Sequence, residues 1–192
     1  MEQGGFVHLR ARSPYSLLEG AMRIGEIAQL CKSLSMPAVA LTDTNNLFGA
    51  LEFSEYISGA GVQPIIGCTF AVKLEADRPA EKVTSAGTLV LLAQDETGYR
   101  NLMALSSSAF LDVEPSEEPS ITLQAILKRH EGLICLTGGY DGVLNRLVCA
   151  DKAPKAGEVL DRLEQVFADR LYIELQRHGR AEELKAEDWL VP

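Results

Sequence analysis

The sequence predicts an α/β fold with a mainly parallel sheet or barrel, and three observations support this prediction. Short apolar segments alternate with segments of helical periodicity, which is the order expected of β-α-β units. Residues 38–42 (AVALT) are nearly all apolar, as in a strand that is buried on both faces. Residues 181–192 end without a capping residue or a closing strand, so we expect the domain to continue beyond residue 192 in a longer protein.

The first half of the chain is predicted to contain three strands and two helices. Residues 6–11, 38–42 and 64–72 have the composition of strands, and the third begins with a proline, where no ladder donor is needed. Residues 24–34 form the first predicted helix, because their apolar side chains recur at helical spacing: Ile24, Ile27, Leu30, Cys31 and Leu34. Residues 50–61 form the second predicted helix, which two glycines end.

The second half continues the alternation. Predicted strands cover residues 89–92, 133–136 and 171–175. Predicted helices cover residues 98–110, 122–130, 155–168 and 181–192. Thr122 is a candidate helix cap, and the acidic segment 112–120 is predicted to be a loop because it carries two prolines. In the last helix, Leu184, Trp189 and Leu190 are available for burial.

The net charge of −9 limits the partners that this chain can bind by itself. A surface that grips a nucleic-acid backbone needs clustered Lys and Arg, because neutralised phosphates supply most of the nonspecific affinity. The sequence has no such cluster, so DNA is expected to be held only by other domains. No apolar run is long enough for a membrane span, and no membrane partner is expected.

The four cysteines are expected to be buried thiols in a reducing compartment, because none belongs to a Cys-x-x-Cys pair and most lie in apolar segments. Residues 1–5 lack the basic and apolar regions of a secretory signal. Both features predict a cytoplasmic protein.

Polar residues gather where three of the predicted strands end. These segments are residues 8–13 (HLRARS), 41–46 (LTDTNN) and 174–179 (ELQRHG). In α/β barrels the chemistry lies at the carboxyl ends of the strands, so these segments are the candidate site.

Five blocks, in order, resemble the N-terminal PHP (polymerase and histidinol phosphatase) domain of bacterial DNA polymerase III α subunits. They are FVHLRARSPYSLLEG (6–20), MPAVALTDTNNLFG (36–49), GVQPIIGCTFAV (61–72), LLAQDETGYRNLMALSS (91–107) and LYIELQRHG (171–179). The resemblance implies a distorted (β/α)7-like barrel, truncated here before its last strands, so that residues 1–192 form one incomplete PHP domain. It also implies a cluster of metal ions at the carboxyl face of the barrel.

This sequence departs from the family pattern at the metal positions. Arg10 and Arg12 stand where the first motif usually has two histidines, and a guanidinium has no lone pair to donate to a metal. Three threonines replace a histidine, a glutamate and a histidine: Thr44, Thr69 and Thr88. Of the usual ligands Asp43 and His178 remain, and a lone carboxylate and a lone histidine rarely hold a catalytic metal cluster. We therefore expect no catalytic residue and no metal in this chain.

The substitutions suggest an ion-paired remnant of the metal cleft. Arg10 and Arg12 are expected to pair with the carboxylates of Asp43 and Glu19, in place of the missing cations. His8 is expected to be a structural residue that its strand buries. His178 has two possible roles, a hydrogen-bonded remnant or a weak metal ligand together with Asp43.

The resemblance implies a structural and interaction module that docks the proofreading exonuclease subunit and other subunits of the polymerase III holoenzyme. Nucleotide transfer would use Mg²⁺ held by carboxylates in a separate palm domain. One alternative is a metal-dependent phosphoesterase or 3′-5′ exonuclease of the same family, which would contain Zn²⁺ or Mn²⁺. A second alternative is a stand-alone protein that binds a phosphate or a nucleotide.

Overall fold

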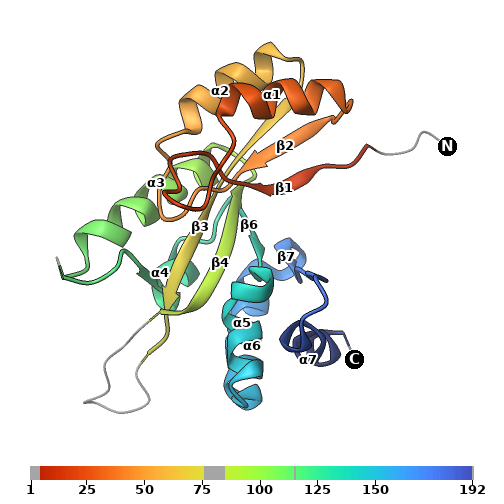
Figure 1. Cartoon of the computed structure of the whole chain (residues 1–192). Coiled ribbons are helices and arrows are strands. Elements are labelled where there is room, and N and C mark those ends of the chain that lie inside the picture. Colours follow the sequence, from red (N-terminus) through yellow and green to blue (C-terminus); the bar gives the residue numbers. More distant parts are fainter. Residues whose placement is uncertain (1–4, 76–84, 115, 192) are drawn as a thin grey trace.

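A twisted seven-stranded sheet forms the centre of the molecule, and helices cover both of its ends (Figure 1). The computed structural model describes residues 5–75, 85–114 and 116–191. Part of the predicted non-secretory start (1–4), one position of the acidic loop (115) and the last residue of the final predicted helix (192) lie outside the described residues. Within the described part of the chain, none of the helices has the length and hydrophobicity that a bilayer span requires.

The sheet is mixed rather than wholly parallel. Its strands are β1 (His8–Ala11), β2 (Ala38–Leu41), β3 (Gln63–Lys73), β4 (Ser85–Ala93), β5 (Ile121–Thr122), β6 (Leu133–Leu136) and β7 (Leu171–Tyr172). They follow the order β1-β2-β3-β4-β6-β7, and β5 pairs with β3. Four of the pairings are parallel, but β4 runs antiparallel to both β3 and β6. The predicted α/β class is confirmed, with β4 as the reversed strand that alternation alone does not reveal.

Seven α-helices surround the sheet in the described part of the chain. They are α1 (Ile24–Ser33), α2 (Ala50–Gly59), α3 (Glu96–Leu111), α4 (Leu123–Lys128), α5 (Val143–Cys149), α6 (Ala153–Phe167) and α7 (Ala181–Leu190). The first two pack beside β1 and β2 around a small core that contains Phe53 and Ile57. The other helices enclose a larger core around β3, β4 and β6. Thr122 caps α4 as predicted, because its side-chain oxygen accepts the Ala125 N–H at 3.1 Å.

Helix α5 has no counterpart among the predicted elements. Most of its residues are buried, including Asn145, so it lacks the polar face that makes helical periodicity visible in a sequence. The predicted strand 171–175 is also too long. The Glu174 N–H donates to the side-chain oxygen of Thr137 at 2.9 Å instead of to a neighbouring backbone, so the ladder ends early.

Three leucines predicted to be buried are exposed. Leu30 and Leu34 point away from the face of α1 that buries Ile24 and Ile27. Leu184 is exposed on α7, while Trp189 and Leu190 of the same helix are partly buried against the larger core. Apolar residues at helical spacing thus cover a wider arc of the helix than the core contacts.

The cysteines are free thiols in the structure. Cys31, Cys68 and Cys135 are buried, and Cys149 is half-buried. Burial raises the pKa of all four thiols, most strongly in the two strand residues Cys68 and Cys135. A high thiol pKa leaves little reactive thiolate at neutral pH, which fits a structural role.

Candidate functional site

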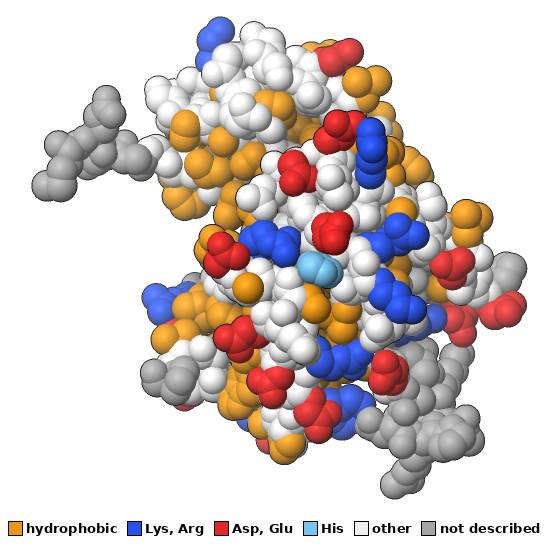
Figure 2. All heavy atoms as spheres, turned by 180° about the vertical axis from the view of Figure 1, so that it is seen from behind, with side chains coloured by type: hydrophobic (Ala, Val, Ile, Leu, Met, Phe, Trp, Pro, Cys, Tyr) orange, Lys and Arg blue, Asp and Glu red, His pale blue; other side chains and the backbone are white. Residues whose placement is uncertain are grey.

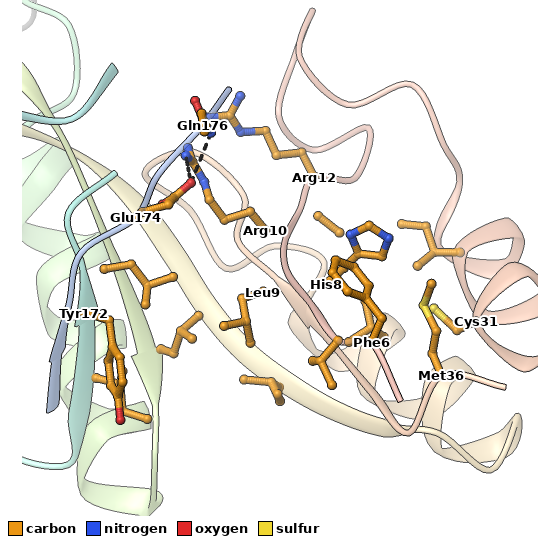
Figure 3. A pocket seen from close by; sticks show the side chains of 18 of the residues that line it. Phe6, His8, Leu9, Arg10, Arg12, Cys31, Met36, Tyr172, Glu174 and Gln176 are labelled. Atoms are coloured by element: carbon orange, nitrogen blue, oxygen red, sulfur yellow. Dashed lines mark hydrogen bonds and ion pairs between the residues drawn. The ribbon is translucent and has the colours of Figure 1, made fainter. Parts of the chain in front are cut away.

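A cleft of about 1500 Å³ lies between the two ends of the sheet. Strand β1 and the residues before and after it form one wall, and residues 172–178 form the other. The floor is apolar and comes from β3, β4 and β6: Ile65, Leu92, Ile134 and Leu136. In Figure 2 the cleft is the indentation on the left side of the molecule, bordered by hydrophobic side chains. Figure 3 shows Arg10, Arg12, Glu174 and Gln176 together at one end of the cleft, with His8 apart from them.

Arg10 connects the two walls at this polar end. Its Nη1 atom donates to the carbonyl oxygen of Gly138 at 3.1 Å and to Oε1 of Glu174 at 2.8 Å (Figure 3). Gln176 Nε2 donates to the same carboxylate oxygen at 3.1 Å. The other oxygen, Oε2, is buried and has no hydrogen-bond partner among the described residues. Arg10 therefore ties β1 to the segment that follows β7.

Gln176 also fills the glycine turn after β6. The Tyr140 N–H donates to its Oε1 atom at 3.0 Å. Gly139 has a φ of +59°, and a Cβ atom there would lie 2.6 Å from the Gln176 side chain. The Gln176 side chain thus occupies this turn, so the turn has no open site for a phosphate.

Arg12 pairs with Glu19 on the loop that follows β1. Its Nε atom lies 3.4 Å from a carboxylate oxygen of Glu19, and the Thr44 hydroxyl donates to the same oxygen at 2.5 Å. Both charged side chains are partly exposed. The prediction that Arg12 would pair with Glu19 is confirmed.

The predicted pairing of Arg10 and Arg12 with Asp43 is wrong, because serines hold that carboxylate. Asp43 Oδ1 accepts the Ser13 N–H at 2.8 Å and the Ser16 hydroxyl at 2.6 Å, while Oδ2 accepts the Ser13 hydroxyl at 2.6 Å. Asp43 is 1% exposed, and both serines are buried as well. The loop after β1 folds back over Asp43. The serine donors of this loop therefore occupy the carboxylate oxygens in place of the arginines.

Two of the threonines at the family metal positions form hydrogen bonds to backbone carbonyl oxygens. Thr69 is buried, and its hydroxyl donates to the carbonyl oxygen of Thr42 at 3.0 Å. Thr44 and Thr69 form an isolated parallel bridge that extends the pairing of β2 and β3. Thr88 donates to the carbonyl oxygen of Asp141 at 3.2 Å. The hydroxyls of Thr69 and Thr88 therefore bind backbone carbonyls, whereas that of Thr44 binds the Glu19 carboxylate.

The two histidines of the site lie apart from Asp43 and its serines. His178 Nδ1 lies 2.8 Å from Oε1 of Glu183, and its backbone N–H donates to Oε2 at 2.7 Å. His8 begins β1 and is exposed, with its ring edge against Phe6 at 4.7 Å. The prediction that its strand would bury His8 is wrong, because β1 is an edge strand beside the open cleft.

The donor set at this end of the cleft does not fit a metal cluster. Both guanidinium groups lack lone pairs, and the Asp43 oxygens already accept three hydrogen bonds. Across residues 5–75, 85–114 and 116–191, no three His, Cys, Asp or Glu side chains come together as a metal site.

Glu183 holds the start of α7, and the ionisation of this carboxylate should make the packing of the helix against the domain pH-dependent. Burial acts to raise the pKa of Glu183, but hydrogen bonds from the His178 side chain and from the N–H groups of Arg180 and His178 outweigh it and hold the pKa below the ordinary 4.5. A hydrogen bond from Arg177, together with its charge, also lowers the pKa of Glu187. A carboxyl group with a lowered folded pKa stabilises the fold above its unfolded pKa, and the contribution is lost as pH falls through the folded pKa.

We therefore expect α7 to loosen as the pH falls below about 4.5, the ordinary glutamate value. Trp189 is the single tryptophan and lies on α7, so its fluorescence reports this change directly. The variant Glu183→Gln has no charge to lose and should show a smaller acid shift in emission. An emission spectrum of the unchanged protein that stays constant throughout acid titration would contradict the assignment.

Comparison with known proteins places this site in a family. The PHP domain model matches residues 8–178. The chain is 49% identical over 190 residues to the DNA polymerase III subunit alpha of Caulobacter vibrioides, covering 99% of this chain and 17% of that protein. It is 38% identical to the corresponding proteins of Rickettsia bellii and Treponema pallidum, covering 97% and 100% of this chain. The chain thus spans about a sixth of the length of these relatives.

Two solved structures are more distant. An amidohydrolase from Chromobacterium violaceum aligns with a TM-score of 0.47 and 12% identity, covering 87% of this chain and 84% of that chain. A putative metal-dependent phosphoesterase from Bifidobacterium adolescentis aligns with a TM-score of 0.47 and 13% identity, covering 93% and 89%.

Proposed function

This chain belongs to the PHP domain family and matches the N-terminal region of DNA polymerase III α subunits, and from this premise we propose that it is a structural and protein-docking module of such a polymerase. Its PHP metal site is degenerate, and the chain has no phosphoesterase activity of its own. The observation that carries this proposal is the set of contacts that Arg10 and Arg12 make where the family places metal ligands.

The contacts at the carboxyl end of β1 support a structural role. Arg10 binds Glu174 and Gly138, and Arg12 binds Glu19, so protein cations neutralise carboxylates at this edge of the sheet. Asp43, the remaining family acid, holds the loop after β1 through two serines. The contacts of Arg10 and Asp43 join chain segments that are distant in sequence, a stabilising role that a bound metal cluster would otherwise have.

The polymerase context of the relatives supports a role within a larger assembly. We assign the proofreading exonuclease subunit as the protein that docks on this domain, within a cytoplasmic holoenzyme. DNA would be bound through other domains, because this chain carries a net charge of −9. Nucleotide transfer with Mg²⁺ would take place in a separate palm domain.

Elemental analysis of protein purified without a histidine tag, after incubation with Mn²⁺ and Zn²⁺, tests the degenerate site. We expect less than about one tenth of an equivalent of either metal, because the donors are occupied or absent. An EDTA-treated sample provides the baseline. About two or three tightly bound ions per chain would reopen the phosphoesterase alternative, together with hydrolysis that a chelator abolishes.

A further inference from the structure

Two leucines stand at the tip of the loop between β1 and α1. Leu17 is 83% exposed and Leu18 is 99% exposed. Scattered exposed leucines are ordinary, but further exposed apolar side chains lie on the same loop and on residues 48–51. These residues together are here called the leucine patch: Leu17, Leu18, Tyr15, Phe48 and Leu51. In Figure 1 this loop lies beside the segment that leads into α2.

Tyr15 joins the two halves of the leucine patch. Its ring meets the ring of Phe48 edge to face at a centroid distance of 6.5 Å. Its hydroxyl donates to Glu52 on α2 at 3.3 Å, and its backbone carbonyl accepts the Asn46 side-chain N–H at 3.1 Å. The loop and the start of α2 therefore form one surface with fixed relative positions.

The loop beneath the leucine patch is rigidly held. Ser13 and Ser16 bind the buried Asp43, and the N–H groups of Glu19 and Gly20 donate to the carbonyl oxygen of Ser16 at 2.9 and 3.0 Å. An ordered surface loses little conformational entropy when a partner binds, so it favours tight association.

Leu18 holds an unfavourable backbone conformation. Its φ is +65°, in the left-handed region that costs energy for residues with a branched or bulky side chain and that asparagine or glycine adopts more readily. Folding alone gives no reason for a leucine here, because its side chain contacts solvent. Strained residues of this kind cluster at binding and switch sites, so the outlier points to recognition.

The two chain segments that carry the leucine patch are acidic. Segment 44–61 contains Glu52 and Glu55 and has no Lys or Arg. Segment 12–26 contains two glutamates and two arginines, and Arg12 already pairs with Glu19. Together the two segments hold four glutamates and two arginines, so a partner gains from Lys or Arg beside its apolar residues.

We propose that the leucine patch docks a basic amphipathic segment of a protein partner, with leucine-sized side chains on its apolar face and Lys or Arg at its borders. This inference rests on the proposed docking function and names the surface that performs it. Leu17 and Leu18 supply the apolar anchors, Tyr15 and Phe48 supply the aromatic contact, and Glu52 and Glu55 supply the charge.

Binding of the exonuclease subunit to the full natural-length protein, measured by calorimetry, tests the proposal. The double variant Leu17→Ser/Leu18→Ser should weaken binding by about tenfold or more, as expected for central apolar anchors. The matched control is Leu184→Ser, which removes another exposed leucine (61%) from α7, away from the leucine patch, and should leave the affinity unchanged. Leu18→Asn should weaken binding while the melting temperature stays the same or rises, which a merely structural role for Leu18 would not produce.

The effect of a charge substitution on the affinity and on its salt dependence provides the second measurement. Glu55→Lys should weaken binding and reduce its dependence on NaCl concentration, because it replaces an attractive negative charge with a repulsive positive one. Wild-type affinity in the leucine variants would overturn the leucine patch and leave the proposed docking function standing. A failure of the unchanged protein to bind the exonuclease subunit would overturn both.

Discussion

Replacing Asp43 by alanine is expected to lower the free energy of unfolding by about 3–5 kcal/mol, because it breaks a buried charged network. The change removes the acceptor of three hydrogen bonds from Ser13 and Ser16. Both serines are buried, so their donors would be left without a partner in a region that water reaches poorly. Such a loss is a large share of the total stability of an ordinary domain, about 5–15 kcal/mol.

Urea unfolding followed by circular dichroism measures this effect. Asp43→Asn keeps one acceptor oxygen and should lose less stability than Asp43→Ala. Asp188→Ala is the matched control, because Asp188 is exposed on α7 and its removal should change stability by less than about 0.5 kcal/mol. A loss below about 1 kcal/mol for Asp43→Ala would show that the serines find other partners.

The same variant connects the site to the leucine patch. Asp43 binds Ser13 and Ser16, and the next residues along the chain are Leu17 and Leu18. Without Asp43 the loop gains conformational freedom, and a partner would have to order it on binding. We therefore expect Asp43→Ala to weaken exonuclease binding even under conditions in which the domain remains folded.

Features that depend on local pattern could be predicted from the sequence. The predicted strand 133–136 has the same bounds as β6, and the predicted helix 24–34 ends one residue beyond α1. Apolar spacing reports the buried face of an element, so the predicted burial of Ile24, Ile27 and Cys31 on α1 is confirmed. The resemblance to the PHP family likewise came from continuous blocks of sequence.

Features that depend on contacts between distant residues could not be predicted in the same way. Arg10 and Glu174 are 164 positions apart, and the sequence supplies their charges without saying that they meet. Asp43 had two arginines as candidate partners, yet the nearer serine hydroxyls bind it. The reversed direction of β4 is also a property of the whole sheet, since a strand reads the same in either direction.

A close backbone contact between α3 and the turn before β6 leads to the second prediction of large effect. A Cβ atom at Gly98 would lie 1.8 Å from the carbonyl oxygen of Gly132. That carbonyl already accepts the Gln94 N–H at 2.8 Å, and the Gly98 N–H donates to the Asp95 side chain at 2.9 Å. Gly132 itself has a φ of +67°, a conformation that suits glycine. Backbone on both sides leaves no flexible group that could move aside.

Gly98→Ala is therefore expected to destabilise the fold by about 3 kcal/mol or more, since α3 must separate from the turn to admit a methyl group. Gly157→Ala is the matched control: Gly157 lies inside α6 with no atom within 4 Å of its ideal Cβ position. This control should gain about 0.5–1 kcal/mol from improved helix propensity. Urea unfolding of both variants separates the two causes, because helix propensity favours alanine at either position. If Gly98→Ala raised the free energy of unfolding as much as Gly157→Ala, α3 and the turn before β6 would not be in contact. The order of strands around β4 would then depend on strand pairing alone.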